Sequence, residues 1–196
     1  NLLADGCLDS IIVWDGIIVD GHNRYEICTE HDIPFSITEM SFDSRESAIA
    51  WICAHQLGRR NLSEATRKYL IGVQYDAEKL SAAHRNKMGL NQYGRLDPES
   101  EAEIESSSPK RPYTAERIAK ENNISPATVL KYSIYSRAVE KLKQKVPEII
   151  PKILSGKYKI SHDNVIELAE LSPQEIRKVM RGIEAKEEAS SRYKVP

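Results

Sequence analysis

The dipeptide Asp15-Gly16 constrains the fold of this chain more than any other feature. It separates two apolar runs, IIVW and IIV, at residues 11–14 and 17–19. Both central residues of a type I′ turn need a positive φ, which Asp and Gly tolerate. Short apolar runs on either side of such a dipeptide are typical of a β-hairpin. We therefore predict a hairpin over 11–19, and with it a sheet.

The rest of the chain is predicted to be mostly helical. Apolar spacing and capping residues favour a helix at 22–31, a strand at 33–37, a helix from Asp43 or Ser44 to about Leu57, and another at 63–87. In that last helix the predicted inner stripe is Thr66, Leu70, Val73, Ala77, Leu80 and His84. Residues 91–112 combine acids, serines and prolines without apolar periodicity, which is typical of a linker.

We divide the chain into a small α/β domain at 1–58, a helical neck at 59–90, the linker at 91–112 and an all-α domain at 113–196. The fold class is thus α+β. The chain is 40% hydrophobic and 29% charged, and contains no run long enough to cross a bilayer. It also starts without a signal-peptide pattern. We therefore expect a cytoplasmic protein with no membrane partner. Its three cysteines have no zinc-ligand spacing, and we expect them to be buried thiols.

Formal charge is distributed unevenly along the chain. Residues 1–50 carry a net charge of −8, whereas residues 109–159 carry +8. Such a basic segment is typical of a region that binds polyanionic phosphate. The alternative interpretation is a solvated helical surface without a nucleic-acid role.

Residues 114–138, TAERIAKENNISPATVLKYSIYSRA, have the pattern of a helix-turn-helix. Asn123 stands where the turn needs a left-handed residue. Ser125 and Pro126 then supply an N-cap and a first helical residue for the second helix. The predicted core of the motif contains Ile118, Ala119, Ile124, Val129 and Tyr132.

The same pattern predicts which residues approach DNA. Ser125, Ala127, Thr128 and Lys131 are expected at the major groove, with Leu130 and Tyr135 as further candidates, and Lys120 and Arg137 are expected at phosphates. The groove side lacks the Arg, Gln or Asn that usually read bases. An αα-hairpin without a DNA role therefore remains an alternative.

The stretch DGHNRYE, residues 20–26, lies where the hairpin ends and a helix begins. The open N–H groups and the positive dipole at a helix start can hold a phosphate. Gly21 would allow close backbone approach, and Arg24 would donate two hydrogen bonds from outside the core. His22 and Asn23 are further donors. A second basic turn contains Arg59 and Arg60. The alternative is that these are only exposed residues at helix ends.

The run LADGCLDSIIVWDGIIVDGHNRYEICTEHDIPF resembles the amino-terminal domain of ParB-like partition proteins, which shares its fold with sulfiredoxin. DGHNRYEI stands at the family's GERR-type phosphate motif, and HQLGRRNLS stands at its ENxxR motif. VPEIIPKILSGKYKISHDNVIELAEL is similar to the helices that follow the family's helix-turn-helix. The family's first strand would precede Asn1.

This resemblance implies a dimeric DNA-binding protein, associated with nucleoid or plasmid, that binds CTP or another nucleotide with Mg²⁺. Gly21, Asn23 and Arg24 would contact the triphosphate, Arg59 would be the arginine of the second motif, and Gln56 would lie at the metal. His55 and Gln56 replace the family's Glu and Asn, which argues against hydrolysis and leaves enzymatic activity open.

Two other classes of function share this fold. DGH followed by a polar residue and Arg24 is similar to free-serine kinases, so a nucleotide-dependent phosphotransferase is the main alternative. A nuclease is a weaker alternative, because no clustered acids suggest metal ligands. Reductase chemistry is not expected, since His22 replaces the reactive cysteine of sulfiredoxin.

Overall fold

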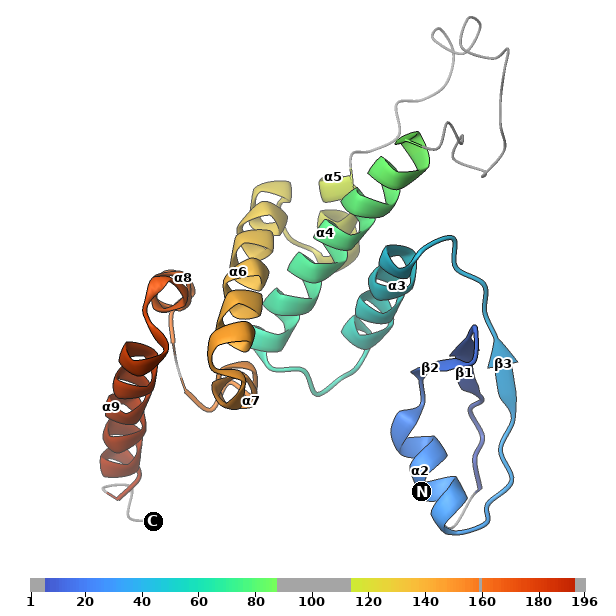
Figure 1. The fold of residues 1–196 in the computed structure, drawn as a ribbon, viewed down its shortest axis with the longest axis horizontal. Coiled ribbons are helices and arrows are strands. Elements are labelled where there is room, and N and C mark those ends of the chain that lie inside the picture. The colour runs from blue at the N-terminus through green and yellow to red at the C-terminus, as the bar shows by residue number, and fades with distance from the viewer. Residues whose placement is uncertain (1–5, 88–113, 159, 193–196) are drawn as a thin grey trace, which may run out of the picture.

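The computed structural model of the chain describes residues 6–87, 114–158 and 160–192. It has a mixed α+β fold in which a small sheet lies at one end and helices form the rest (Figure 1). The predicted α+β class is confirmed. The predicted linker at 91–112 lies outside the described residues.

The sheet has three strands in the order β2-β1-β3. β1 (Ile11–Trp14) pairs antiparallel with β2 (Ile17–Asp20), and Asp15 and Gly16 between them have φ of 47° and 76°. The predicted hairpin is therefore confirmed. β3 (Ile37–Glu39) pairs parallel with β1, and all three of its residues are exposed. The strand predicted at 33–37 is wrong in its bounds, because the register with β1 begins only at Ile37.

Two helices lie near the sheet and precede the helical region in the sequence. α2 (His22–Glu30) follows β2 directly, and α3 (Arg45–Leu57) begins at the N-cap Ser44, whose side chain accepts from the backbone N–H of Ser47. α3 lies between the sheet and the remaining helices (Figure 1). Rings link the sheet to α3, because Phe42 contacts both Trp14 and Trp51 at centroid distances of 5.7 Å.

α4 (Glu64–Lys87) packs between α3 on one side and α6 (Pro126–Lys145) on the other. Its predicted inner stripe is only partly right, since Ala77 is buried but Leu80 is 61% exposed. The buried residues are instead Ile71, Gly72, Gln74, Tyr75, Ala77 and Ser81, because the helix is covered on two sides. The side chain of His84 lies outside those described.

Gly72 allows the backbones of α4 and α6 to approach closely. A Cβ atom added at Gly72 would lie 2.1 Å from the carbonyl oxygen of Tyr132, far inside van der Waals contact. No residue with a side chain fits there without moving one helix. The crossing of α4 and α6 therefore depends on this glycine.

α5 (Thr114–Asn122) and α6 form the predicted helix-turn-helix. Asn123 has a φ of 55°, and Ser125 accepts a hydrogen bond from the N–H of Thr128. The buried core of the motif consists of Ile118, Ala119 and Val129, together with Ile71 and Tyr75 of α4. The predicted turn, cap and core are confirmed. α4 thus completes the helix-turn-helix instead of only leading up to it.

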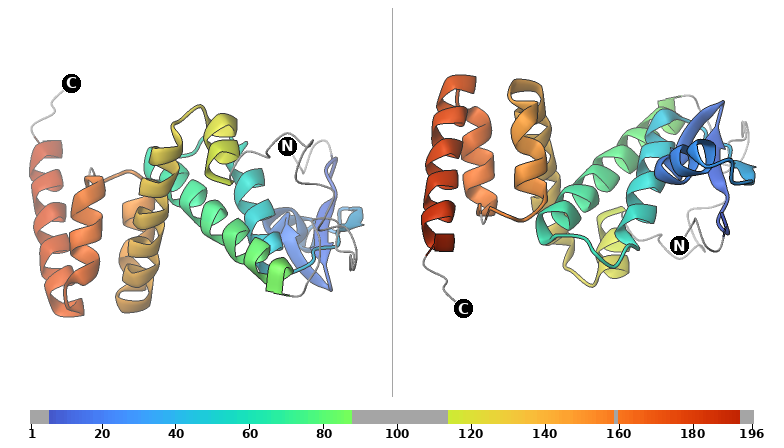
Figure 2. Two further views of the ribbon diagram at one scale, coloured as in Figure 1. Left: turned by 90° about the horizontal axis from the view of Figure 1, so that it is seen from above. Right: turned by 90° about the horizontal axis from the view of Figure 1, so that it is seen from below.

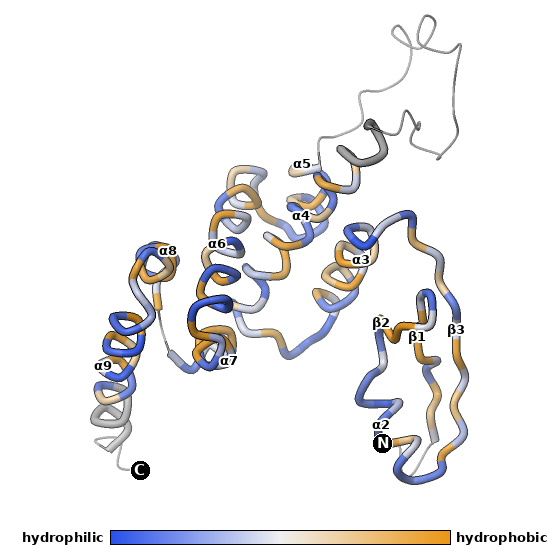
Figure 3. Tube along the Cα trace, viewed as in Figure 1, coloured by the Kyte–Doolittle hydropathy of each residue, from blue (hydrophilic) through white to orange (hydrophobic). Residues whose placement is uncertain are grey.

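The remaining helices form a second core with α6. They are η1 (Pro147–Ile149), α7 (Ile150–Leu154), α8 (His162–Glu170) and α9 (Pro173–Arg192). α8 packs against α6, and α8 and α9 both contribute buried residues to this core at the end of the molecule away from the sheet (Figure 2). Apolar and polar residues alternate around their turns, as packing of one face requires (Figure 3). Among the described helices, none has the length and apolar character that crossing a bilayer requires.

The cysteines agree in part with the expectation of buried thiols. Cys28 and Cys53 are buried, whereas Cys7 is half-buried. Burial raises the pKa of the Cys53 thiol to about 12. That thiol therefore stays protonated and unreactive near neutral pH.

Candidate functional site

The end of β2, the start of α2 and the end of α3 surround a cavity of about 680 Å³. Its lining includes Gly21, His22, Asn23, Arg24, Gln56 and Arg59. The two sequence motifs, far apart along the chain, therefore meet at one place. Arg60 is exposed and does not line the cavity, although the sequence pairs it with Arg59.

Asp20 organises this cavity, and sequence reasoning assigned it no role. Only 6% of its side chain is exposed. One carboxylate oxygen accepts from Arg24 Nη2 at 2.9 Å, and the other accepts from Arg59 Nη2 at 3.3 Å. His55 Nε2 lies 3.6 Å from Oδ2. A buried carboxylate is costly unless such partners satisfy it, so Asp20 holds the two arginines in place.

One sequence signal could have revealed Asp20. An acid four residues before an arginine faces the same side of a helical turn, which favours an ion pair. Asp20 and Arg24 have that spacing across the junction. The contact with Arg59 depends on the tertiary fold and has no local signal.

The structure corrects the expected roles of Gly21 and Arg24. Gly21 has a φ of 97°, and a Cβ atom there would lie 3.1 Å from Arg24 Nη2. The glycine therefore makes room for the Arg24 side chain, and close approach of an anion to Gly21 stays a prediction. The Arg24 side chain is only 26% exposed and also donates to the Ser10 carbonyl at 3.2 Å. Arg24 is therefore half-buried and already engaged by Asp20 and Ser10, so it is less free than the sequence predicted.

Other donors around the cavity remain exposed. His22 and Asn23 are exposed at the start of α2, and the side chains of His55 and Arg59 are 53% and 57% exposed. The His55 ring stacks on Trp51 with a centroid distance of 4.9 Å and an interplanar angle of 7°. The imidazole is therefore held in one orientation at the cavity.

The charges of the cavity suit an anion. Asp20 is the only acid among the described lining residues, and Arg24 and Arg59 exceed it by one positive charge. The first turn of α2 contains no acidic residue. Its first N–H groups and dipole add to the attraction for a phosphate.

The metal contact expected at Gln56 stays a prediction. Gln56 lines the cavity. However, no group of three or more His, Cys, Asp or Glu residues in the described part of the chain could hold a metal ion. Because Asp20 is already paired with arginines, a Mg²⁺ ion would need phosphate oxygens of a ligand as its main partners.

The helix-turn-helix exposes a second candidate surface. Ser125, Ala127 and Lys131 are exposed at the start of α6, as Lys120 is on α5. Thr128 is half-buried, and its hydroxyl lies 2.8 Å from that of Ser125. Lys120 and Lys131 have no ion-pair partner among the described residues. Both are therefore available to phosphate.

Two residues predicted for this surface have other positions. Tyr135 is only 3% exposed and faces inward, so it cannot approach a groove. Arg137 donates to Asp76 of α4 through Nε at 2.8 Å and Nη2 at 2.7 Å. Ser133 donates to the same carboxylate at 2.8 Å. Arg137 thus joins α6 to α4, and two of its guanidinium nitrogens already donate to Asp76.

Much of the positive charge at 109–159 is paired within the fold. Lys141 contacts Glu170 at 2.9 Å, and Lys152 contacts Glu184. Lys145 donates to backbone carbonyls at the end of α8, at Ala169 and Leu171. The net charge of the segment therefore overstates what it can offer to DNA.

Comparison of the chain with protein-family models, with curated proteins and with solved structures gave no match.

Proposed function

We propose that the chain is a DNA-binding protein, of the partition or transcription-regulator type, whose α/β module binds a nucleotide. CTP with Mg²⁺ is the first candidate ligand. The observation that carries this proposal is the cavity in which Asp20 holds Arg24 of one motif and Arg59 of the other. Residues of both motifs, DGHNRYE and HQLGRRNLS, lie at the start of α2.

The cavity supports binding of a phosphorylated ligand in particular. Its volume of about 680 Å³ leaves room for more than a single anion. Arg59 has only one contact to Asp20, so the rest of its guanidinium can bind phosphate oxygens. His22, Asn23 and His55 are exposed donors around it.

The helix-turn-helix supports the DNA-binding part of the proposal. Its turn, cap and core support a role in which the second helix enters a major groove. Lys120 and Lys131 flank the exposed start of that helix. Among the described residues this surface offers two available lysines and none of the side chains that usually read bases, so each copy would bind DNA weakly and with little sequence discrimination. Pairing of two copies would double the contact, so we expect a homodimer.

The path between the two sites is short. α3 ends at Leu57, Arg59 follows it, and α4 begins at Glu64. α4 then supplies Ile71 and Tyr75 to the helix-turn-helix core. A ligand that moves Arg59 therefore acts on the connection that leads into α4. Nucleotide and DNA should change each other's affinity by the same factor.

Calorimetry with CTP, ATP and ADP in the presence of Mg²⁺ tests the nucleotide site. Arg59→Ala should remove a charge-assisted contact of about 1.5–3 kcal/mol, a loss of roughly 10- to 150-fold in affinity. Arg60→Ala is the matched control, because Arg60 is its exposed neighbour outside the cavity. Absence of binding at millimolar nucleotide, or equal losses in both variants, would refute the site.

Fluorescence anisotropy with duplex DNA at several salt concentrations tests the DNA surface. The double variant Lys120→Ala/Lys131→Ala should reduce the slope of log affinity against log salt by about 2, since each phosphate contact contributes about 0.9. Lys141→Ala is the control, because Lys141 is paired with Glu170. An unchanged slope in the double variant would place the DNA contact elsewhere.

A nucleotide-dependent phosphotransferase is the second candidate. The imidazoles of His22 and His55 both line the cavity, and imidazole transfers protons near neutral pH. Phosphorus NMR of ATP incubated with the protein and free serine separates the two functions. Formation of phosphoserine and ADP would favour the kinase, and unchanged ATP would favour the ligand-binding protein.

A further inference from the structure

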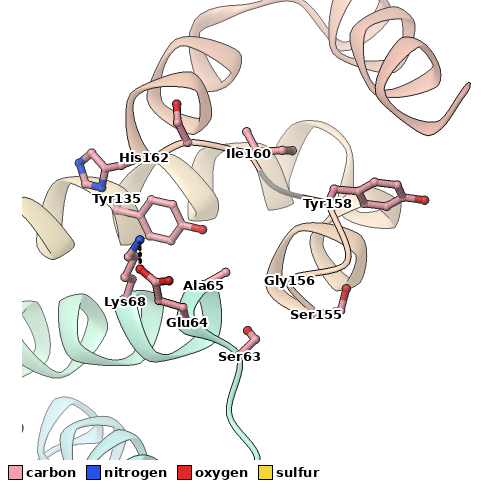
Figure 4. Close-up of a pocket in the computed structure, with 11 residues that line it drawn as sticks. Ser63, Glu64, Ala65, Lys68, Tyr135, Ser155, Gly156, Tyr158, Ile160 and His162 are labelled. Carbon is pink, nitrogen blue, oxygen red and sulfur yellow. Dashed lines mark ion pairs between the residues drawn. The ribbon is translucent and has the colours of Figure 1, made fainter. Parts of the chain in front are cut away.

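A second cavity, of about 510 Å³, lies between the start of α4, Tyr135 of α6 and the connection from α7 to α8 (Figure 4). It shares no lining residue with the cavity at Asp20. Two helices begin at it, α4 with its cap Ser63 and α8 with its cap Ser161. The first N–H groups of a helix have no partner inside the helix, and its positive dipole end attracts anions.

The walls of this cavity are joined by contacts between distant parts of the chain. The hydroxyls of Ser63 and Thr66 both donate to the carbonyl of Leu154 at the end of α7, the latter at 2.8 Å. Gly156 has a φ of +72°, and a Cβ atom there would lie 3.3 Å from the Cβ of Ser63. The start of α4 and the end of α7 are thus held close together, and the cavity is preformed.

Tyr135 gives an independent sign of a ligand. The residue is 3% exposed, and Figure 4 shows its hydroxyl pointing into the cavity. That hydroxyl has no hydrogen-bond partner among the described residues, and it faces the open space of the cavity, where a ligand oxygen could accept from it. His162 stacks on the ring at a centroid distance of 5.5 Å and fixes it. Burial and the charge of Glu64 raise the pKa of Tyr135 to about 12, so the hydroxyl stays a donor.

One cation and one acid face each other at the mouth of the cavity. Lys68 Nζ lies 2.6 Å from a Glu64 oxygen, and the two side chains are 25% and 80% exposed. Pairs of this kind on an exposed helix surface are weak. The Glu64 carboxylate can therefore turn to solvent and leave the Lys68 ammonium to another anion.

We infer that this cavity binds a phosphate group, with the Tyr135 hydroxyl, the Lys68 ammonium and the starts of α4 and α8 as its donors. These donors come from several directions, which matches the oxygens of a tetrahedral anion better than those of a planar carboxylate. Described residues between α7 and α8 form one wall of the cavity, and a small phosphorylated molecule is one source of such a group. The phosphate of a DNA backbone is the other source with the same chemistry.

NMR of the full chain tests this inference, with the side-chain signals of Tyr135 and His162 followed while inorganic phosphate is added. We expect a saturable shift of both signals. Tyr135→Phe, which keeps the ring, and Lys68→Met should each weaken binding by about 10-fold. Glu64→Gln should strengthen it, because it removes the competing anion. Tyr132→Phe, on the same helix but outside the cavity, should change nothing.

The opposite signs of the Lys68 and Glu64 variants distinguish phosphate binding from a general loss of folding. The inference would be overturned by the lack of a saturable shift, by full binding in Tyr135→Phe, or by acetate binding as tightly as phosphate. Addition of duplex DNA identifies the source of the phosphate group. If inorganic phosphate displaces DNA from this cavity, as followed by the Tyr135 and His162 signals, the site belongs to the DNA backbone. Arg59→Ala should leave the titration unchanged, so this site and the nucleotide site can fail separately.

Discussion

The α/β module and the helical region use charge in opposite ways. Residues 1–50 have a net charge of −8, yet they hold Asp20, on which two arginines converge. Residues 109–159 have a net charge of +8, yet Arg137, Lys141 and Lys152 pair with acids of other segments. The difference teaches that the charge available to a ligand depends on which side chains are buried or already paired. The net charge of a segment does not locate it.

Two Asp–Arg pairs make this comparison quantitative. The Asp20 and Arg24 side chains are 6% and 26% exposed, whereas those of Asp76 and Arg137 are 23% and 66% exposed. Solvent therefore screens the second pair more than the first. The same substitution at the two arginines should therefore have very different effects.

Arg24→Met should have the largest effect on folding. It leaves the buried Asp20 with only Arg59 and His55, and removing one partner of a buried pair costs about 3–5 kcal/mol. We expect about 3 kcal/mol, the lower end of that range, because Arg59 still contacts Asp20. Urea denaturation followed by circular dichroism measures the loss. A loss below about 1 kcal/mol would show that solvent reaches Asp20.

Gly72→Ala comes next, and it tests whether packing rather than charge supports the helical region. The added methyl group would meet the Tyr132 carbonyl, and overpacking a tight contact costs about 1–3 kcal/mol. The midpoint of urea denaturation should fall accordingly. Gly182→Ala is the control, because no heavy atom lies within 4 Å of a Cβ placed there. Equal behaviour of the two variants would contradict the close crossing of α4 and α6.

Arg137→Met should have a small effect, within about 1 kcal/mol, because its pair with Asp76 is largely exposed. High salt should reduce that effect further, whereas the effect of Arg24→Met should persist. Denaturation of both variants at low and high salt gives the comparison. If the two arginines respond alike to salt, the contrast between the regions is wrong.

The smallest expected effect is a loss of thermal stability at low pH. A hydrogen bond from Lys141 lowers the pKa of Glu170, and a backbone hydrogen bond together with Arg177 lowers that of Glu148. A carboxyl group with a lowered pKa stabilises the fold above its unfolded pKa, and this contribution disappears as the pH falls through the folded value. Thermal stability should therefore decline slightly as the pH falls below about 4.3, the usual range for Glu. Glu170→Gln should show a smaller decline.

Local signals in the sequence predicted the elements that depend on one turn of chain. Asp15-Gly16 predicted the hairpin, and Asn123 with Ser125 predicted the helix-turn-helix. Both follow from backbone geometry and capping within a few residues. Only the resemblance linked DGHNRYE with HQLGRRNLS in the sequence, and the structure places Arg24 and Arg59 of these segments at one cavity.

The wrong predictions concern elements whose environment is set by distant segments. Leu80 is exposed because α3 and α6 cover other sides of α4, and one apolar stripe cannot describe a helix between two neighbours. Tyr135 is buried against the connection from α7 to α8, which lies much later in the chain. Arg137 found its partner, Asp76, on another helix. No local pattern specifies such contacts.

Asp20 places a carboxylate of the protein itself beside the cavity. Any incoming phosphate must compete with this resident group for Arg59, so singly charged ligands gain little by entering. A ligand with several negative charges can bind Arg59 and the start of α2 together. Because the arginines are already oriented, little conformational freedom is lost when it arrives. In the proposed nucleotide site, Asp20 would therefore favour highly charged ligands over weakly charged ones.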